Sequence, residues 1–375
     1  MCKWLFSFLF LTFCIYGELD LRIPVVDMQD YYDETKRKDF LNTLYDAMTT
    51  VGFFAVRNTG VDASLIRDAY WQAEMFFKQD EAEKHLSFAQ ELNGQRGFVP
   101  GETAKGCKEK DKKEFFHIAR KTAIPGNVWP RQKGFQQTLQ QLFDELEKYS
   151  VPLLQTIVAT INQRSGASLD ICQFSDMTKN GASLLRASYY PALKKEEWDK
   201  SQLPYWAAPH TDIDFLTILP YATAQGLQVE FEGQWLNVVV PEDAFVVNVG
   251  DMLENISNGL FVSARHRVLA QEIGQDRLSM VLFVHPYDKA PLDPLPACIE
   301  LTGGKQTYAP GTREEFLWER LLELDIAAPG LLKLYAETGH TERQIQYHRE
   351  SPQVVDLLIR HNLASPELLQ ALKKG

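Results

Sequence analysis

The feature that most constrains the fold is a succession of short strand-like segments in the second half of the chain. Two residue pairs typical of tight turns, Glu232-Gly233 and Asn258-Gly259, lie between them. Many short strands joined by glycine-containing turns are typical of a β-sandwich or jelly roll. The segments span residues 183–191, 214–220, 226–240, 244–253, 264–270 and 277–286.

Amphipathic segments flank this strand-rich part on both sides. The longest carries an apolar stripe over residues 135–166, and Pro152 inside it is expected to bend or split the helix. From Arg313 onward the pattern is helical again, with a helix at 313–325 and two polar helices after it. Shorter elements come first, with strands expected at 22–28 and 53–60 and helices at 36–52 and 62–80.

Residues 87–127 form a long irregular stretch in which only 114–120 is strand-like. Irregular segments of this length are often lids or substrate loops. No repeat or linker divides the chain, so we expect one α+β domain with a double-stranded β-helix (a cupin-like jelly roll) as its core, flanked by helices. The predicted parts are an apolar N-terminal extension at 1–20, a helix-and-strand region at 21–180, the jelly-roll core at 181–290 and a helical region at 291–375 that packs on the same domain.

The N-terminus has Lys3 followed by an apolar run from Trp4 to Tyr16. This resembles the charged start and apolar centre of a signal peptide, but no A-x-A cleavage site follows. The run is also shorter than a standard membrane span. The alternatives for residues 1–17 are an export signal, a short anchor, or an extension outside the fold.

Charge and cysteine content limit the partners and the compartment. The formal net charge is −11, which argues against binding to nucleic acid or to an anionic membrane surface. The 5 cysteines are scattered, without CxxC or zinc-type spacing, and this suits a reducing compartment better than a disulfide framework.

One strand-like segment, APHTDIDFLTIL at residues 208–219, carries charge where apolar side chains are expected. In a continuous strand, His210, Asp212 and Asp214 point to the same face because side chains alternate. Buried charge is costly unless it is paired or bound to a metal. A solvated face, pairing with nearby arginines and a metal site all explain the pattern, and a further ligand is needed to decide.

Among the 8 histidines, His266 is the best placed third ligand, because it lies in a strand-like segment of the same half of the chain as His210. Two histidines and one carboxylate on one side of a metal form the facial triad of non-haem iron(II) oxygenases. Zinc with the same ligands is the competing interpretation, but the HExxH helix common in such sites is absent. The other histidines are expected at the surface (His85, His340, His348, His361) or on strands (His117, His285).

Arg277 and Ser279 stand two positions apart on a predicted strand and therefore on one face. A guanidinium with a neighbouring hydroxyl suits a planar carboxylate. If Arg277 and Ser279 stood alone, the simpler interpretation would be an ordinary arginine that pairs with an acidic residue elsewhere. Here, however, His-x-Asp, His and Arg-x-Ser follow one another in order within the strand-rich half.

This ordered set resembles the HxD…H…RxS pattern of iron(II)- and 2-oxoglutarate-dependent dioxygenases. The chain is most similar to the isopenicillin N synthase-like branch of that family, from Leu21 to about Leu324. The matching segments also include IPVVDM, VGFFAVRNTGV, GFVPGETAKG, KEFFHIAR, RASYYP, GLQVEFEGQWLNV, NVGDMLENISNG and FVHP.

The resemblance implies that His210, Asp212 and His266 ligate iron(II). It also implies that Arg277 and Ser279 hold the distal carboxylate of 2-oxoglutarate. The implied reaction uses dioxygen and converts 2-oxoglutarate to succinate and carbon dioxide while a small organic substrate is oxidised. Hydroxylation is the usual outcome in the family, and desaturation and ring closure also occur.

Residues near these motifs have less definite roles. Tyr190 matches a tyrosine that hydrogen-bonds 2-oxoglutarate in relatives, whereas Ser188 stands where many relatives have asparagine. Asp214 is expected at the pocket rim or paired with a base. His285 is either a pocket contact or a residue at a capped strand end, and Asp251 is expected to be a turn residue.

Two alternatives to a 2-oxoglutarate-dependent dioxygenase stay open. One is an iron(II) oxidase of the isopenicillin N synthase type, which does not use 2-oxoglutarate, and the more distant one is a non-catalytic cupin-like binding protein. Because iron(II) and 2-oxoglutarate are cytosolic supplies, we expect a cytoplasmic protein, and we expect a monomer. The substrate is not identified, although residues 87–127 are expected to contact it and Arg96 or Arg186 is a candidate partner for an acidic group.

Overall fold

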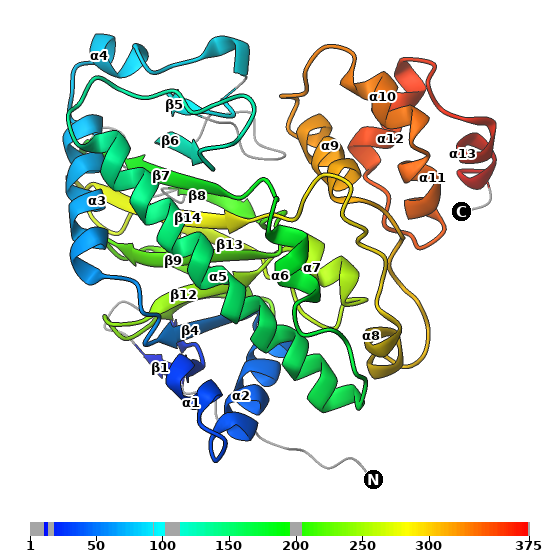
Figure 1. The fold of residues 1–375 in the computed structure, drawn as a ribbon. Coiled ribbons are helices and arrows are strands. Elements are labelled where there is room, and N and C mark those ends of the chain that lie inside the picture. Colours follow the sequence, from blue (N-terminus) through cyan, green and yellow to red (C-terminus); the bar gives the residue numbers. More distant parts are fainter. Residues whose placement is uncertain (1–10, 14–18, 93, 102–112, 196–204, 374–375) are drawn as a thin grey trace.

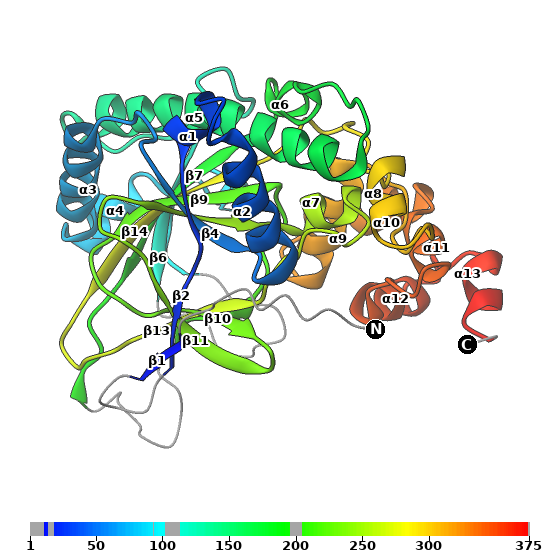
Figure 2. The same cartoon turned by 90° about the horizontal axis from the view of Figure 1, so that it is seen from below.

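The structure is a computed structural model that describes residues 11–13, 19–92, 94–101, 113–195 and 205–373. Two β-sheets form its centre, and helices cover the outer face of the larger sheet (Figures 1 and 2). The eight successive strands β7 to β14 are divided equally between the two sheets. This arrangement is the jelly roll predicted from the sequence, and the α+β class is confirmed.

The larger sheet has 8 strands in the order β3-β4-β12-β9-β14-β7-β6-β5. All neighbours are antiparallel except β3 and β4. In β14, Leu278, Met280 and Leu282 enter the hydrophobic core, so Arg277 and Ser279, which alternate with them, face the inside of the roll. The strands are β3 (Val25–Asp27), β4 (Phe53–Arg57), β5 (Gly97–Val99), β6 (Glu114–Ala119), β7 (Leu184–Tyr190), β9 (Leu216–Ala222), β12 (Phe245–Val249) and β14 (Arg277–Val284).

The smaller sheet has 6 strands in the order β1-β2-β11-β10-β13-β8. Glu232 and Gly233 join β10 to β11 with positive φ values of 50° and 75°, as expected for a tight hairpin turn. Asn258 and Gly259 also have the positive φ values of a tight turn, 55° and 76°, but helix α7 (Asp251–Ile256) stands between them and β12, so they do not join two strands directly. The strands are β1 (Leu11–Phe13), β2 (Leu19–Arg22), β8 (Tyr205–His210), β10 (Leu227–Phe231), β11 (Gln234–Val239) and β13 (His266–Leu269).

Helix α5 (Phe135–Ser165) crosses the outer face of the larger sheet, and α3 (Ala63–Phe77) stands beside it (Figure 1). Pro152 lies inside α5 and does not split it. Fully buried rings, including Phe76, Phe116 and Phe135, fill the space between these helices and the sheet. The remaining helices of this part are α1 (Met28–Tyr32), α2 (Arg37–Thr50), α4 (Glu81–His85), the 3₁₀ helix η1 (Gln90–Leu92), α6 (Gln173–Thr178) and α8 (Pro296–Leu301).

The C-terminal region contains more helices than the two polar ones predicted after α9 (Arg313–Glu323). They are α10 (Leu331–Glu337), α11 (His340–Ile345), α12 (Pro352–Arg360) and α13 (Pro366–Ala371). They share a small apolar cluster of their own with Leu322 of α9. His340, expected at the surface, is instead fully buried against α9.

Some predictions concern segments of the chain of which the structure describes only some residues. Of the predicted N-terminal extension, only β1 and the start of β2 are described, and the boundaries drawn at residues 20, 180 and 290 remain predictions. In the described part of the chain, no helix is both long and apolar enough to cross a lipid bilayer.

Candidate active site

The charged segment at residues 208–219 is not one continuous strand. Strand β8 of the smaller sheet ends at His210, and β9 of the larger sheet begins at Leu216. The prediction that strand alternation aligns His210, Asp212 and Asp214 is therefore wrong. Asp212 and Asp214 lie in the connection between the sheets, which turns the two carboxylates into different surroundings.

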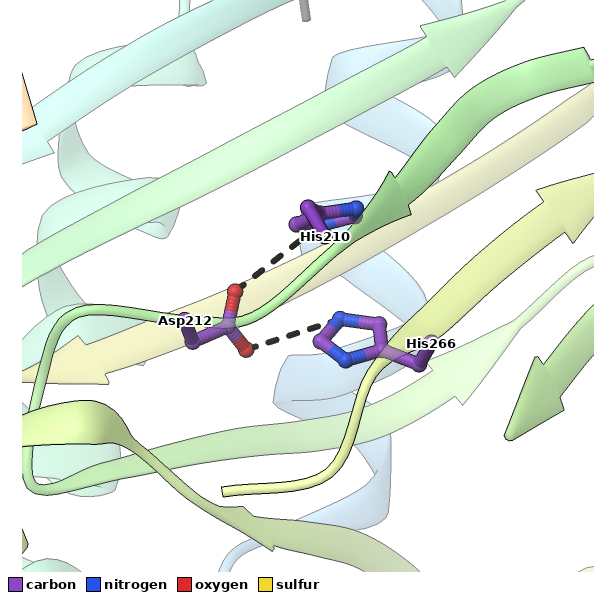
Figure 3. A group of neighbouring side chains, drawn as sticks. All are labelled: His210, Asp212 and His266. Carbon is purple, nitrogen blue, oxygen red and sulfur yellow. Dashed lines mark ion pairs between the residues drawn. The ribbon is translucent and has the colours of Figure 1, made fainter. Parts of the chain in front are cut away.

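His210, Asp212 and His266 nevertheless converge, as Figure 3 shows. The Nε2 atom of His210 lies 3.9 Å from Oδ1 of Asp212, and Nε2 of His266 lies 3.7 Å from Oδ2. One donor atom from each residue lies within 4.8 Å of the others. Within the described ranges, no other group of three such side chains comes this close.

Backbone contacts orient both imidazoles. His210 and His266 stand opposite each other on β8 and β13, with ring centroids 4.4 Å apart. Nδ1 of His210 lies 2.7 Å from the carbonyl oxygen of Ala208, and Nδ1 of His266 lies 3.2 Å from that of Ala264. A carbonyl only accepts, so Nδ1 carries a proton in both rings and Nε2 is the nitrogen that faces the centre of the group.

Asp212 is held in the ionised form. Thr217 and Asn248 donate hydrogen bonds of 2.6 and 2.9 Å to its Oδ2 atom. Burial raises the pKa of this carboxyl, but the two histidines and these hydrogen bonds outweigh burial and lower the pKa to about 2. Burial lowers the pKa of His210 to about 3, so its imidazole is neutral at pH 7.

This donor set fits a divalent transition metal. Asp212 is 8% exposed, and among the described residues no lysine or arginine forms an ion pair with it. A buried carboxylate without a cation is costly, whereas a metal between the three donors neutralises it. Two imidazoles and one carboxylate on one side are the ligands that iron(II) oxygenases use.

Asp214 has a different role from the one predicted. It is fully buried rather than at a pocket rim, and no base pairs with it in the described part of the chain. Its Oδ2 atom lies 3.1 Å from the hydroxyl of Thr217, and its Oδ1 atom has no hydrogen-bond partner there. Gly250 packs so closely that a Cβ at this position would lie 2.3 Å from Asp214. Burial and the neighbouring charge of Asp212 raise the pKa of Asp214 well above its usual range.

Arg277, Ser279 and Tyr190 lie together on neighbouring strands of the larger sheet. Tyr190 stands directly opposite Arg277, whose guanidinium carbon lies 5.1 Å from the centre of the tyrosine ring. Arg277 donates from Nη1 to Ser279 Oγ (3.0 Å) and from Nε to the carbonyl of Ala224 (3.1 Å). It is 2% exposed, and it has no ion-pair partner among the residues that the structure describes.

Further side chains inside the roll were not all anticipated. Arg186 lies over the rings of Phe115 and Phe283, at 4.4 and 5.2 Å, and its Nε donates to His117 Nε2 at 2.7 Å. His285 is 8% exposed, and its Nδ1 has no partner among the described residues. Phe115 and His117 on β6, Arg186 on β7 and Phe283 on β14 form one inner wall of the roll, and His285 directly follows β14.

Arg96 does not join this wall, because it donates to the backbone carbonyls of Gln95 and Pro125.

Thr217 and Asn248, which hold Asp212, were not predicted from the sequence. The available signal was a lone asparagine inside the apolar run FVVNV, since buried polar groups are normally hydrogen-bonded.

Two domain families match the chain. Residues 23–138 match the N-terminal domain described as non-haem dioxygenase in morphine synthesis, and residues 181–286 match the 2OG-Fe(II) oxygenase superfamily. The chain belongs to the 2OG-Fe(II) oxygenase superfamily. It is a 2-oxoglutarate- and Fe(II)-dependent dioxygenase, with Fe(II) as its metal and 2-oxoglutarate as its cosubstrate.

This oxygenase has relatives in plants and bacteria. It is 28% identical to codeine O-demethylase of Papaver somniferum, over 70% of this chain and 72% of that one. It is 27% identical to jasmonate-induced oxygenase 2 of Arabidopsis thaliana, over 78% of each chain. In fold it is similar to the crystal structure of a 2OG-Fe(II) oxygenase family protein from Caulobacter crescentus, with a TM-score of 0.69, 28% identity and coverage of 80% of this chain and 98% of that one.

Proposed function

We propose that this oxygenase couples the oxidative decarboxylation of 2-oxoglutarate to the oxidation of a small organic molecule, with His210, Asp212 and His266 as its iron ligands. The observation that carries the proposal is the convergence of two imidazoles, of which that of His210 is neutral, on a buried carboxylate that pairs with no lysine or arginine among the described residues. Bound iron would supply the activation of dioxygen. The protein's own part is to hold the three donors on one side of the metal.

Arg277, Ser279 and Tyr190 are proposed to hold the distal carboxylate of 2-oxoglutarate. A guanidinium that is 2% exposed calls for an anion, and none of the described carboxylates provides one. A planar carboxylate matches the fork of the guanidinium and the adjacent hydroxyl. Ser188 stands opposite Ser279 and is available as a further, shorter donor.

The substrate is proposed to be a small molecule that is oxidised by hydroxylation, desaturation or ring closure. Support comes from the inner wall with Phe115, Phe283 and Arg186, and from the small-molecule names of the two plant relatives. A screen of small molecules for stimulated succinate formation by iron-loaded protein tests this proposal. Turnover without 2-oxoglutarate would indicate the oxidase type instead, and failure to bind iron would indicate a non-catalytic binding protein.

His210→Ala and Asp212→Ala should each abolish succinate formation without unfolding the protein. Each removes one of three ligands, whereas the surrounding hydrogen bonds of the sheets remain. Activity and thermal unfolding should be measured on the same samples. Full activity in either variant would contradict the assignment of the ligands.

We also propose that the enzyme is cytoplasmic and monomeric. The support is chemical, because iron(II) and 2-oxoglutarate are supplied in the cytosol and the cysteines are scattered. A fusion of residues 1–17 to a reporter that works only after export tests the compartment, and light scattering tests the oligomeric state. Export of the reporter or a dimeric mass would overturn the respective proposal.

A further inference from the structure

Asp251, the first residue of α7, touches both chain segments that carry the candidate iron ligands. Its backbone N–H donates to the carbonyl of Asp212 at 2.7 Å. Its Oδ2 atom accepts from the hydroxyl of Thr211 at 3.1 Å, and Thr211 lies between His210 and Asp212. The Oδ1 atom of Asp251 accepts a hydrogen bond from Ser263. The backbone N–H and both carboxylate oxygens of Asp251 therefore all form hydrogen bonds.

The contact with Ser263 leads to the third ligand. Ser263 Oγ donates to Asp251 Oδ1 at 2.6 Å. The next residue, Ala264, provides the carbonyl that orients the imidazole of His266. Asp251 thus connects the segment of His210 and Asp212 to the segment of His266 from outside the metal centre.

The counter-ion of Asp251 comes from the C-terminal region. Arg320 of α9 places Nη2 2.6 Å from Oδ2 of Asp251, and the two side chains are 17% and 24% exposed. Arg320 also lies 3.4 Å from Glu323. Figure 1 shows α9 between the strands of the roll and the helices α10 to α13. No other lysine or arginine of the described residues forms an ion pair with Asp251.

Other contacts fix the position of α9 itself. Thr312 and Glu315 form a capping box at its start, and Arg343 of α11 pairs with Glu315 at 2.7 Å. Leu322 packs in the apolar cluster of the C-terminal helices. The guanidinium of Arg320 is therefore presented to Asp251 by a helix that is anchored on both sides.

We propose that Arg320 is a positioning residue of the metal centre. By holding Asp251 in place, it fixes the two segments that present His210, Asp212 and His266. Without this cation, a largely buried carboxylate is uncompensated and turns toward water, which releases Thr211 and Ser263. The inference rests on the proposed assignment of these three residues as iron ligands.

The test compares Arg320→Met with Arg360→Met, which also removes a C-terminal arginine paired with a carboxylate, but one that pairs with Asp356 of its own helix α12 and not with Asp251 or α9. Anaerobic calorimetry with Fe(II) gives the metal dissociation constant, and thermal unfolding of the metal-free proteins gives stability. Loss of a partner behind metal ligands commonly weakens metal binding about 10- to 100-fold. We expect a loss in this range for Arg320→Met and less than about twofold for Arg360→Met.

Two further variants separate positioning from general packing. Arg320→Lys keeps the charge and should restore most of the metal affinity. Thr211→Val removes only a hydroxyl that contacts Asp251, and it should weaken metal binding even if Arg320→Met fails to fold. Wild-type metal affinity in Thr211→Val, or in a folded Arg320→Met protein, would overturn the proposal.

A failure of the proposed function itself would look different. In that case His210→Ala would bind Fe(II) as tightly as the wild type, whatever the Arg320 variants do. If His210→Ala loses the metal and the Arg320 variants keep it, only the positioning role is wrong.

Discussion

Thr217 has one hydroxyl hydrogen and two carboxylates within hydrogen-bonding distance. The shorter contact, 2.6 Å, goes to Asp212, and the longer, 3.1 Å, goes to Asp214. If Thr217 donates to the ionised Asp212, then Asp214 has to donate to Thr217, which requires its protonated form. One threonine therefore gives two neighbouring acids different protonation states, and only Asp212 is left as an anion for the metal.

This difference predicts opposite results for two similar substitutions. Asp214→Asn preserves a neutral side chain of the same shape and should bind Fe(II) within about threefold of the wild type, well below the roughly tenfold that a lost outer partner costs. Asp212→Asn removes the charge of a proposed ligand and should lose metal binding. Anaerobic calorimetry on both variants is the measurement. Equal losses in the two variants would show that Asp214 is also needed as an anion.

Arg277 permits a prediction about the cosubstrate alone. Arg277→Met should raise the KM for 2-oxoglutarate by about 10- to 150-fold, because hydrogen bonds to charged groups contribute about 1.5–3 kcal/mol. Fe(II) affinity without 2-oxoglutarate should change little, since Arg277 does not touch the three ligands. Steady-state succinate formation gives the KM. Arg57→Met, at a half-exposed arginine paired with Asp243, is the control, and an unchanged KM in Arg277→Met would refute the role.

At the scale of secondary-structure elements, the alternation of side chains predicts their direction correctly within a strand and incorrectly in a connection between two strands. It correctly placed Arg277 and Ser279 on one face of β14, because that strand is continuous over 8 residues. It failed at residues 208–219, where the chain passes from one sheet to the other between His210 and Leu216. Local sequence carries no signal for such a passage, because both halves have strand-like composition. The pair His210 and Asp212 was nevertheless identified, because the motif does not depend on the strand.

Helix α11 shows a second limit of local sequence. His340 lies among polar residues, and a surface position was expected. In the structure its Nε2 atom lies 3.4 Å from Glu319, and its Nδ1 atom lies 3.7 Å from Glu315. Both glutamates belong to α9, and their spacing on that helix looks like an ordinary solvated face. Only the packing of α11 on α9 shows that they enclose a histidine.

This enclosure predicts how the stability of the C-terminal region depends on pH. Burial lowers the pKa of His340, but Glu315 and Glu319 outweigh it, and the net pKa is raised from 6.5. The protonated form is thus favoured by folding. Its contribution is complete below pH 6.5 and is lost as the pH rises through the raised pKa.

The wild type should therefore exceed His340→Gln in Tm by more at about pH 6 than at about pH 9. His361→Gln, at an exposed histidine, is the control and should show no such trend. A Tm difference that is constant or grows toward alkaline pH would contradict the ion-pair explanation.

For the whole molecule, the proposed metal centre connects the two sheets. His210 and His266 belong to the smaller sheet, and Asp212 is held by Thr217 and Asn248 of the larger one. A ligand that binds only the folded chain stabilises it by about 2.7 kcal/mol at a hundredfold excess over its dissociation constant. Mn(II), which is less easily oxidised, should accordingly raise the Tm. The rise should be absent in His266→Ala, and an equal rise there would indicate metal binding elsewhere.

The sequence predicted the fold class, the family and the three residues that meet at the centre, because these depend on ordered motifs. It did not predict the inner wall around Arg186, whose neighbours come from β6 and β14. Nor did it predict the contact between Arg320 and Asp251, which are 69 positions apart. Such contacts depend on how distant elements pack, and no local pattern reports them.

The pairing of β8 with β13 has a consequence for how the protein reaches its native state. His210 and His266 are direct neighbours in this pairing, although 56 positions separate them along the chain. Such long-range pairings form late, because the entropy of closing the intervening loop is lost before the contact compensates for it. We therefore expect that a nascent or partly folded chain does not offer all three donors at once. The capacity to capture a redox-active metal then arises only when the surrounding protein is already closed around it.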